Sequence, residues 1–310
     1  MIRVENLSKS YTTGIFKKQQ FKAVDDVTFT IAPGETLGLV GESGCGKSTL
    51  ARAILRLITP SKGRVFFKGR DVAAAGTREL NKIRGKMQII FQHPETALNP
   101  RLRIYDSITE PMRIQNVVSD RAEERERVSA LLEQVGLYEE HLTRYPHELS
   151  GGQIQRVVLA RILSLHPEFI VADEPTSMLD VSVQAQVLNI FKEIQQKYDI
   201  SYLFISHDLE VVRWMSDCMA VMYKGRIVEI GPTEDVYQNP QHPYTTLLVD
   251  AFTSFNNGRE ETTEVAVMSR EIEPGGCRYA PFCSAASAAC DEVPELKEVT
   301  RGHYAACRHV

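Results

Sequence analysis

The stretch GESGCGKS, residues 41–48, matches the pattern G-x-x-x-x-G-K-[S/T] at every fixed position. It follows the apolar run TLGLV, which is typical of a buried strand, and it precedes a segment with apolar residues at helical spacing. Glycines at such a turn let backbone N–H groups curl around phosphate oxygens, and the helix N-terminus adds partial positive charge. The stretch therefore predicts a nucleotide-binding loop between a strand and a helix.

Individual residues of this loop have distinct predicted roles. We expect Lys47 to reach the β- and γ-phosphates of ATP and Ser48 to ligate Mg²⁺. Cys45 contributes mainly its backbone, so its thiol is incidental to nucleotide binding. The predicted ATP-binding residues of the segment are Gly41, Glu42, Ser43, Gly44, Cys45, Gly46, Lys47, Ser48 and Thr49.

A second element of the candidate site is the acidic pair that ends the apolar run FIVADE, residues 169–174. We expect Asp173 to hold the Mg²⁺ shell and Glu174 to orient and deprotonate the attacking water. Many exposed strand ends carry acids, so this pair is weak evidence by itself. It indicates a Mg²⁺ site only in combination with the phosphate loop.

Segments typical of strands alternate with segments typical of helices along the rest of the chain. The strand-like segments are residues 23–31, 167–175 and 201–208, and the helix-like segments are residues 76–88, 119–135 and 183–198. This alternation predicts an α/β fold with a mainly parallel sheet that is covered on both faces.

Composition limits the class of protein. The chain has 310 residues, of which 43% are hydrophobic and 25% charged, and its net charge of −4 argues against nucleic acid as the main partner. No apolar run approaches the roughly 18 residues that span a bilayer, and the N-terminus lacks the apolar core of a secretory signal. A reducing cytoplasm is therefore the expected compartment.

The stretch LSGGQ, residues 149–153, precedes a strongly helical pattern. Ser150 is suited to cap that helix, and the two glycines allow a γ-phosphate to approach closely. With this stretch in place, the chain over residues 1–245 resembles the ATPase subunit of ABC transporters. The resemblance implies a P-loop NTPase of the ABC ATPase type with a helical subdomain at about residues 93–160.

The resemblance also implies roles for residues that are uninformative alone. Tyr11 matches the aromatic residue that stacks on adenine, and Gln92 matches the glutamine that links nucleotide, Mg²⁺ and transporter. His207 matches the switch histidine at the γ-phosphate, so that Glu174, His207 and Gln92 form the implied catalytic set. Asp180 matches the loop that contacts the opposite subunit.

The family arrangement implies that two ATPase chains sandwich two ATP molecules head to tail. The surface that faces the partner's ATP would be formed by Leu149, Ser150, Gly151, Gly152 and Gln153. ATP binding would close the pair, and hydrolysis with product release would open it.

Three further stretches resemble the oligopeptide, dipeptide and nickel branch of importers: ALNPRL at 97–102, DVSVQAQVLNIF at 180–191 and NPQHPYTTLL at 239–248. This resemblance implies a second, non-identical ATPase chain, two membrane permease subunits and an extracytoplasmic solute-binding protein. The chain would then lie peripherally on the cytoplasmic side of the cell membrane and energise peptide import. A nickel importer ATPase and a soluble ABC ATPase with a redox-sensing iron–sulfur tail remain alternatives.

The last part of the chain concentrates cysteines with the spacing C-x5-C-x6-C-x16-C, at Cys277, Cys283, Cys290 and Cys307. Disulfides are disfavoured in a reducing compartment, and zinc sites usually place pairs of ligands two to four residues apart. An iron–sulfur cluster also takes four cysteines. The tail resembles the C-terminal extension of oligopeptide and dipeptide importer ATPases, which binds a [4Fe–4S] cluster in some members.

These observations divide the chain into three parts. We expect an ATPase domain over residues 1–245, a polar linker over 246–276 and a short cysteine-rich C-terminal extension over 277–310. The extension has little core of its own, so we expect metal ligation to stabilise it, with a [4Fe–4S] cluster favoured over Zn²⁺. His303 and His309 are expected at the surface.

Overall fold

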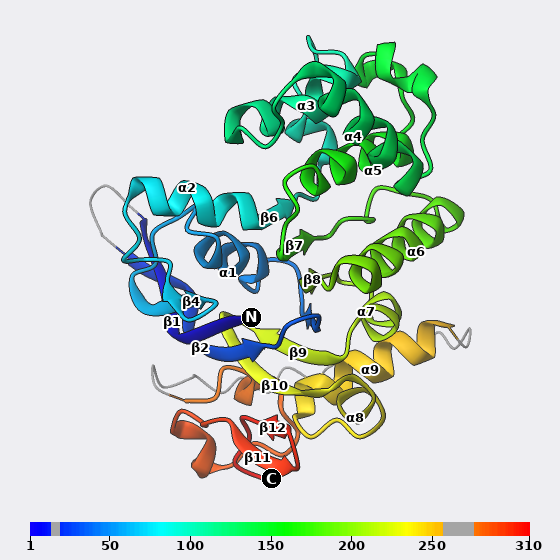
Figure 1. The fold of residues 1–310 in the computed structure, drawn as a ribbon. Helices are drawn as coiled ribbons and strands as arrows, with labels where there is room; N and C mark the ends of the chain where they lie inside the picture. The colour runs from blue at the N-terminus through cyan, green and yellow to red at the C-terminus, as the bar shows by residue number, and fades with distance from the viewer. Residues whose placement is uncertain (14–18, 257–275) are drawn as a thin grey trace.

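The computed structural model describes residues 1–13, 19–256 and 276–310, which form two sheets with helices packed around them (Figure 1). The smaller sheet is antiparallel, with strand order β2-β1-β4-β5. Its strands are β1 (Ile2–Thr13), β2 (Gln19–Ile31), β4 (Lys62–Phe67) and β5 (Arg70–Asp71).

The larger sheet has eight strands in the order β11-β12-β10-β9-β3-β8-β7-β6. Its strands are β3 (Thr36–Val40), β6 (Met87–Ile90), β7 (Phe169–Asp173), β8 (Ser201–Ile205), β9 (Cys218–Tyr223), β10 (Arg226–Pro232), β11 (Lys297–Thr300) and β12 (His303–Ala305). The run from β9 to β6 is parallel, whereas β10, β12 and β11 extend it in antiparallel fashion.

The expectation of a mainly parallel sheet is therefore correct only for the centre of the molecule. The central strands are buried along their whole length, and alternate side chains enter different cores. Ile170 and Ala172 of β7 face one core, while Phe169 and Val171 face the other. Because successive side chains of a strand point to opposite faces, this pattern shows that both faces are covered.

The helices cover these two faces and build a separate lobe. They are α1 (Lys47–Ile54), α2 (Thr77–Lys86), α3 (Ile104–Gln115), α4 (Arg121–Gln134), α5 (Gly151–Leu163), α6 (Val181–Tyr198), α7 (Leu209–Met215), α8 (Thr233–Gln238) and α9 (Pro243–Asn256). Short 3-10 turns lie at Pro94–Ala97, Glu139–Thr143, Pro146–Glu148, Ala280–Phe282 and Ala288–Asp291. Helices α3, α4 and α5 project as a bundle beyond the β6–β7 edge of the sheet (Figure 1).

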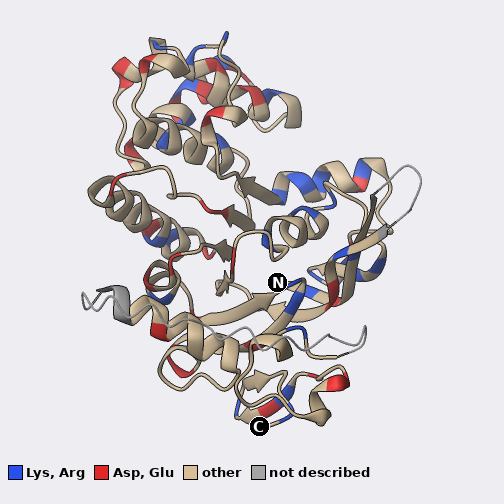
Figure 2. Ribbon diagram, turned by 180° about the vertical axis from the view of Figure 1, so that it is seen from behind, with Lys and Arg blue, Asp and Glu red and all other residues tan. Residues whose placement is uncertain are grey.

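Charged residues of both signs are interspersed over this helical bundle, as Figure 2 shows from behind. No helix within the described ranges is both long enough and apolar enough to cross a bilayer.

The C-terminal segment differs from the expected separate extension. Its strand β12 pairs with β10 of the ATPase domain, with Glu229 opposite Ala305 and Ile230 opposite Tyr304, so the segment completes the main sheet. The start of the predicted linker, up to Asn256, is helical because it belongs to α9. The rest of that linker, residues 257–275, lies outside the described residues.

Candidate functional site

The phosphate loop connects the end of β3 to the start of α1, as its sequence predicts. Gly46 is the N-cap of α1 at φ 116°, and a Cβ there would come within 2.1 Å of the carbonyl oxygen of Ala23. Gly41 has φ 149°, and its Cβ would come within 2.2 Å of the carbonyl oxygen of Met222. Both positions require glycine because any side chain would strain the backbone and collide with another segment.

The side chain of Lys47 curls back over this loop. Its Nζ donates hydrogen bonds to the carbonyl oxygens of Gly41 at 2.6 Å and Glu42 at 3.0 Å. The ammonium is thus held beside the space that the loop encloses, where phosphate oxygens can replace the carbonyls as acceptors. Burial raises the pKa of the Cys45 thiol, which keeps that thiol neutral and agrees with an incidental role.

Two of the three residues predicted to serve Mg²⁺, Ser48 and Asp173, meet in the structure. Ser48 Oγ donates a hydrogen bond of 3.0 Å to Asp173 Oδ1, and Asp173 is buried at the end of β7. Burial raises the pKa of Asp173, the Ser48 hydrogen bond lowers it, and the neighbouring charge of Glu174 raises it again, with a net increase. A hydroxyl and a carboxylate oxygen suit Mg²⁺, which would relieve the cost of burying this charge.

This balance gives a first prediction, for Asp173→Asn. An amide oxygen still accepts the Ser48 hydrogen bond but carries no buried charge, so the nucleotide-free variant should be more stable than the wild type at neutral pH. The native pKa of Asp173 is raised, so native protein binds more protons than unfolded protein between the two pKa values, and wild-type stability falls as pH rises through that window. The stability advantage of the variant should therefore grow with pH in urea unfolding.

The same variant should lose hydrolysis that depends on Mg²⁺. An advantage that shrinks with rising pH, or Mg²⁺-dependent turnover equal to that of the wild type, would contradict this assignment of Asp173.

Glu174 is the centre of the predicted catalytic set. Its Oε2 accepts a 2.9 Å hydrogen bond from Gln92 Nε2 and lies 3.3 Å from Nδ1 of His207. Gln92 follows β6, Glu174 follows β7 and His207 follows β8, and these are adjacent parallel strands whose carboxyl ends share one edge of the sheet. The non-glycine residue Glu174 also has φ 50°, a strained value of the kind that accumulates at functional sites.

The stretch LSGGQ, residues 149–153, is the signature segment, and it leads into α5. Ser150 is its N-cap, as predicted, and forms a reciprocal capping box with Gln153. Leu149 is buried beneath the turn. A Cβ on Gly152 would come within 2.5 Å of Val183, whereas a Cβ on Gly151 would meet only Leu179, at an ordinary 3.5 Å. Gly151 therefore accepts a side chain that projects from the surface more readily than Gly152 does.

The roles assigned to Tyr11 and Asp180 stay predictions, but the structure shows the surroundings of both side chains. Tyr11 is 40% exposed on β1, with the Lys9 ammonium 5.1 Å from its ring centroid, so the ring is accessible for stacking. Asp180 caps α6, and its pKa is lowered because its carboxylate accepts hydrogen bonds from the Val183 N–H and the Ser182 hydroxyl. Its contact with an opposite subunit stays a prediction.

One residue that touches the phosphate loop has no assigned role in the sequence analysis. The backbone N–H of Glu42 donates a 3.1 Å hydrogen bond to the hydroxyl of Tyr244, a fully buried residue on α9. The Tyr244 ring packs against Tyr223 at 4.5 Å and against Tyr279 of the C-terminal segment at 5.5 Å between centroids. The loop is thus connected to the cysteine-rich segment through an aromatic cluster. The sequence signal for Tyr244 is its place in the stretch NPQHPYTTLL, which resembles the importer branch but does not indicate a contact with the phosphate loop.

The four predicted cysteine ligands line one small cavity, together with His242 and His309. Burial raises the pKa values of the Cys277 and Cys283 thiols. His309 is exposed, as expected, and its Nε2 lies 3.6 Å from the sulfur of Cys290. Within the described ranges, however, no three His, Cys, Asp or Glu side chains are positioned to hold a metal ion. The structure therefore gathers the thiols around a common space but not in ligand geometry.

The surface position expected for His303 is wrong. The residue is 1% exposed, and its Nε2 lies 2.7 Å from Glu229 Oε1. Glu229 is fully buried on β10 and also accepts hydrogen bonds from the backbone N–H groups of Gln241 and His242, each at 2.8 Å. One carboxylate thereby joins β10, the segment leading into α9 and β12.

Comparisons with known proteins agree with this geometry. A family model described as "ABC transporter" matches residues 24–177, and a model described as "Oligopeptide/dipeptide transporter, C-terminal region" matches residues 228–290. The chain is 44% identical over 304 residues to the oligopeptide transport ATP-binding protein AppF of Bacillus subtilis, covering 95% of this chain and 92% of that protein. It is 43% identical over 308 residues to OppF of the same organism, covering 99% and 96%.

A solved structure supports the same fold. The dimeric post-hydrolysis structure of the ATP-binding cassette MJ0796 bound to ADP and Pi aligns with a TM-score of 0.68 at 28% identity. The alignment covers 75% of this chain and 99% of that chain.

Proposed function

Because the chain belongs to the family of ABC transporter ATP-binding proteins, we propose that its hydrolysis of ATP energises the import of oligopeptides or dipeptides through a membrane transporter. The chain is an ATPase of the cassette type. The observation that carries the proposed substrate class is its similarity, over nearly its full length, to relatives named for oligopeptide transport. The match of residues 228–290 to the C-terminal region of such transporters supports the same class.

The residues of the site divide the work of hydrolysis. Lys47 binds the β- and γ-phosphates from within the loop, and Glu174 accepts the proton of the attacking water. Gln92 and His207 hold the Glu174 carboxylate in place through the contacts at 2.9 and 3.3 Å. Mg²⁺ on Ser48, Asp173 and Gln92 would neutralise phosphate charge during transfer. Tyr11 would hold the adenine.

We propose further that the signature segment Leu149–Gln153 completes the site of a second ATPase chain, non-identical to this one. The likeness to a cassette solved as a dimer supports pairing of two such chains. The pair would act on two permease subunits at the cytoplasmic side of the membrane, downstream of an extracytoplasmic solute-binding protein.

Gly151→Asp tests the role of the signature. A carboxylate at this exposed helix start would repel the partner's γ-phosphate, while the added Cβ meets only Leu179 at 3.5 Å. Nucleotide affinity of the isolated variant should match the wild type, and ATPase activity of the assembled pair should fall by at least about tenfold. Gly76→Asp, at a glycine whose Cβ would meet nothing within 4 Å, is the matched control. Loss of nucleotide affinity in Gly151→Asp, or full activity of the pair, would refute the two-chain site.

Transport by the reconstituted complex tests the substrate class. ATPase activity in proteoliposomes that contain the permeases and the solute-binding protein should rise on addition of di- to pentapeptides and not on addition of Ni²⁺. Stimulation by Ni²⁺ alone would favour the nickel importer and would leave the ATPase chemistry intact.

For the C-terminal segment we propose a [4Fe–4S] cluster held by the four cysteines, with Zn²⁺ as the alternative. Four thiols around one cavity fit a four-cysteine group. Their spacing is wider than that of the ligand pairs in usual zinc sites, which favours the cluster over one zinc ion. The connection of this segment to the ATPase domain favours a structural role over a redox-sensing one.

Anaerobic purification and metal analysis decide between these groups. We expect brown protein with about four irons and four sulfides per chain. Cys290→Ser should lose most of the iron, and Cys218→Ser, which changes a cysteine outside the cavity, should keep it. Colourless protein with about one zinc per chain would establish the alternative.

A further inference from the structure

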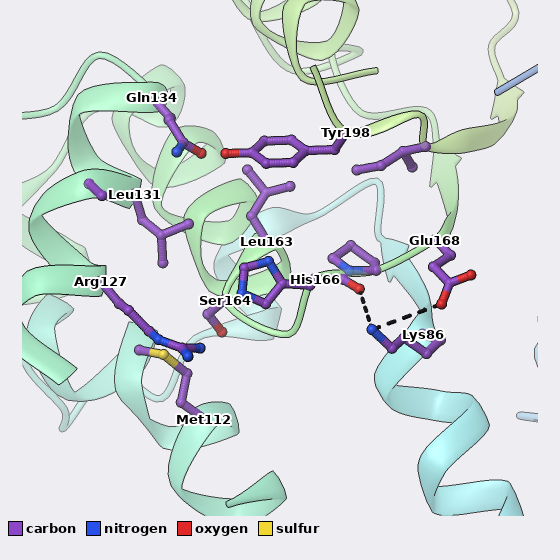
Figure 3. Close-up of a pocket in the computed structure, with 13 residues that line it drawn as sticks. Lys86, Met112, Arg127, Leu131, Gln134, Leu163, Ser164, His166, Glu168 and Tyr198 are labelled. Carbon is purple, nitrogen blue, oxygen red and sulfur yellow. Dashed lines mark hydrogen bonds and ion pairs between the residues drawn. The ribbon is translucent and has the colours of Figure 1, made fainter. Parts of the chain in front are cut away.

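A cavity lies between the helical bundle and the parallel sheet, away from the nucleotide site (Figure 3). Its walls come from α3, α4 and the end of α5 on one side, and from the segments that precede β6, β7 and β8 on the other. Residues 166–168 precede β7, whereas Asp173 ends it, so the cavity and the Mg²⁺ pair lie at opposite ends of this strand. At about 3.3 Å per residue, the separation is on the order of 15 Å.

The cavity measures about 340 Å³ and is mostly apolar. Met112, Leu131, Leu163 and Ile200 supply much of its lining. This size and character fall within the usual range of sites for small organic molecules, in which a few polar groups fix the orientation of an apolar body.

Two polar atoms in this lining are buried and have no hydrogen-bond partner among the described residues: Nη1 of Arg127 and Oε1 of Gln134. The other terminal nitrogen of Arg127 is held by Glu123 Oε1 at 2.7 Å, which fixes the guanidinium on α4. Buried polar groups in native proteins are nearly always paired, because leaving one unpaired destabilises the folded state. The cavity therefore offers one fixed cationic donor and one fixed acceptor.

The other charged residues of the cavity are already engaged. The Lys86 ammonium donates to the His166 carbonyl oxygen at 3.0 Å and lies 3.9 Å from Glu168, as the dashed lines of Figure 3 show. Burial, together with the charges of Arg127 and Lys86, lowers the pKa of His166, so its ring is neutral near pH 7. His166 has φ 49°, a strained backbone that supports a functional role for this turn. Arg127 is likewise paired with Glu123, but its Nη1 still has no partner among the described residues, so this nitrogen is the charged donor that remains open to a ligand.

From this arrangement we propose that the cavity is a binding site for a small apolar α-amino acid or a short apolar peptide. The ligand carboxylate accepts hydrogen bonds from Arg127, its ammonium or N–H group donates to Gln134 Oε1, and its apolar side chain packs against the leucines. In Figure 3 the Tyr198 ring points toward Gln134. Its hydroxyl would therefore contact the same end of the ligand.

A ligand in this cavity would contact both the helical bundle and the segments that adjoin the main sheet. Arg127 and Gln134 belong to α4 of the helical bundle. His166 lies just before β7, and Tyr198 ends α6 just before β8, so both adjoin the main sheet. The cavity also adjoins the end of α5, the helix that begins at the signature segment. A bound ligand would therefore fix the far end of the helix that presents the signature to the partner chain.

Isothermal titration calorimetry on the full chain tests this site with L-leucine, L-phenylalanine and the dipeptide Leu-Leu. We expect saturable binding of at least one of the three, which does not compete with Mg-ATP. Leucinamide lacks the carboxylate and 4-methylpentanoate lacks the ammonium group, so each should bind at least about tenfold more weakly than leucine. These measurements do not involve transport, so their outcome is separate from that of the peptide-import proposal.

Matched variants locate the binding. Arg127→Gln should weaken binding at least about tenfold, and Arg125→Gln, at an exposed position of the same helix, should leave it unchanged. Ala130 lines the cavity at an exposed position, so Ala130→Phe adds a large side chain there and should abolish binding without loss of fold. No saturable binding of any of the three probes, equal weakening by the two arginine variants, or displacement by Mg-ATP would overturn the proposal.

Discussion

Glu174→Gln is expected to lower the ATP turnover of the assembled pair by at least about 100-fold while ATP affinity stays within about twofold of the wild type. The amide has the shape of the carboxylate and can still accept the Gln92 hydrogen bond, which is 2.9 Å in the wild type. It cannot accept a proton from the attacking water at neutral pH. The variant should therefore bind ATP, close with its partner and remain closed.

Single-turnover hydrolysis measures the loss of turnover, and size-exclusion chromatography with ATP detects the closed pair. Glu126→Gln, an equivalent change at an exposed position of α4, controls for the loss of one charge. Turnover within about threefold of the wild type, with the partner's own sites inactivated, would remove Glu174 from the role of base.

The second large effect concerns stability. Glu229→Ala should lower the free energy of unfolding by about 3–5 kcal/mol, because it leaves His303 and two backbone N–H groups buried without their acceptor. Urea unfolding measures the loss, and limited proteolysis should show that the C-terminal segment is released first.

Glu292→Ala is the matched control, because that carboxylate is 78% exposed and pairs with Arg308 at the surface. Its loss should cost no more than about 1 kcal/mol. Equal destabilisation by the two changes would show that the buried carboxylate does not hold the C-terminal segment in place.

The parts of the site that the sequence predicts are those that depend on short, contiguous patterns. The phosphate loop and the capped start of α5 each place their chemistry within a few residues, so their spacing indicates their geometry. The acidic pair is equally local, but its role is predicted only in combination with the phosphate loop. Tyr244 and Glu42 are 202 residues apart, and His303 and Glu229 are 74 apart. Hydrophobic periodicity does not predict such pairs, because each pair forms only when distant segments come together in the assembled sheet.

The fold shows the same difference between features that depend on local patterns and features that depend on distant partners. Buried runs such as residues 169–173 predict the parallel centre correctly, since both faces of those strands are covered. The antiparallel strands β10, β12 and β11 depend on which strands pair with each other. The alternation of apolar and polar residues within one strand does not specify its partner. The C-terminal segment reads as a separate unit because it is short and follows a polar stretch, yet β12 pairs with β10 in the main sheet.

That pairing of β12 with β10 has a practical consequence for recombinant work on this protein. Removing the last 35 residues would expose the β10 edge and leave its hydrogen-bonding groups open to strands of other molecules. A shortened chain prepared to avoid cysteine oxidation should therefore aggregate more readily than the full one. Oxidation is better prevented by anaerobic handling than by truncation.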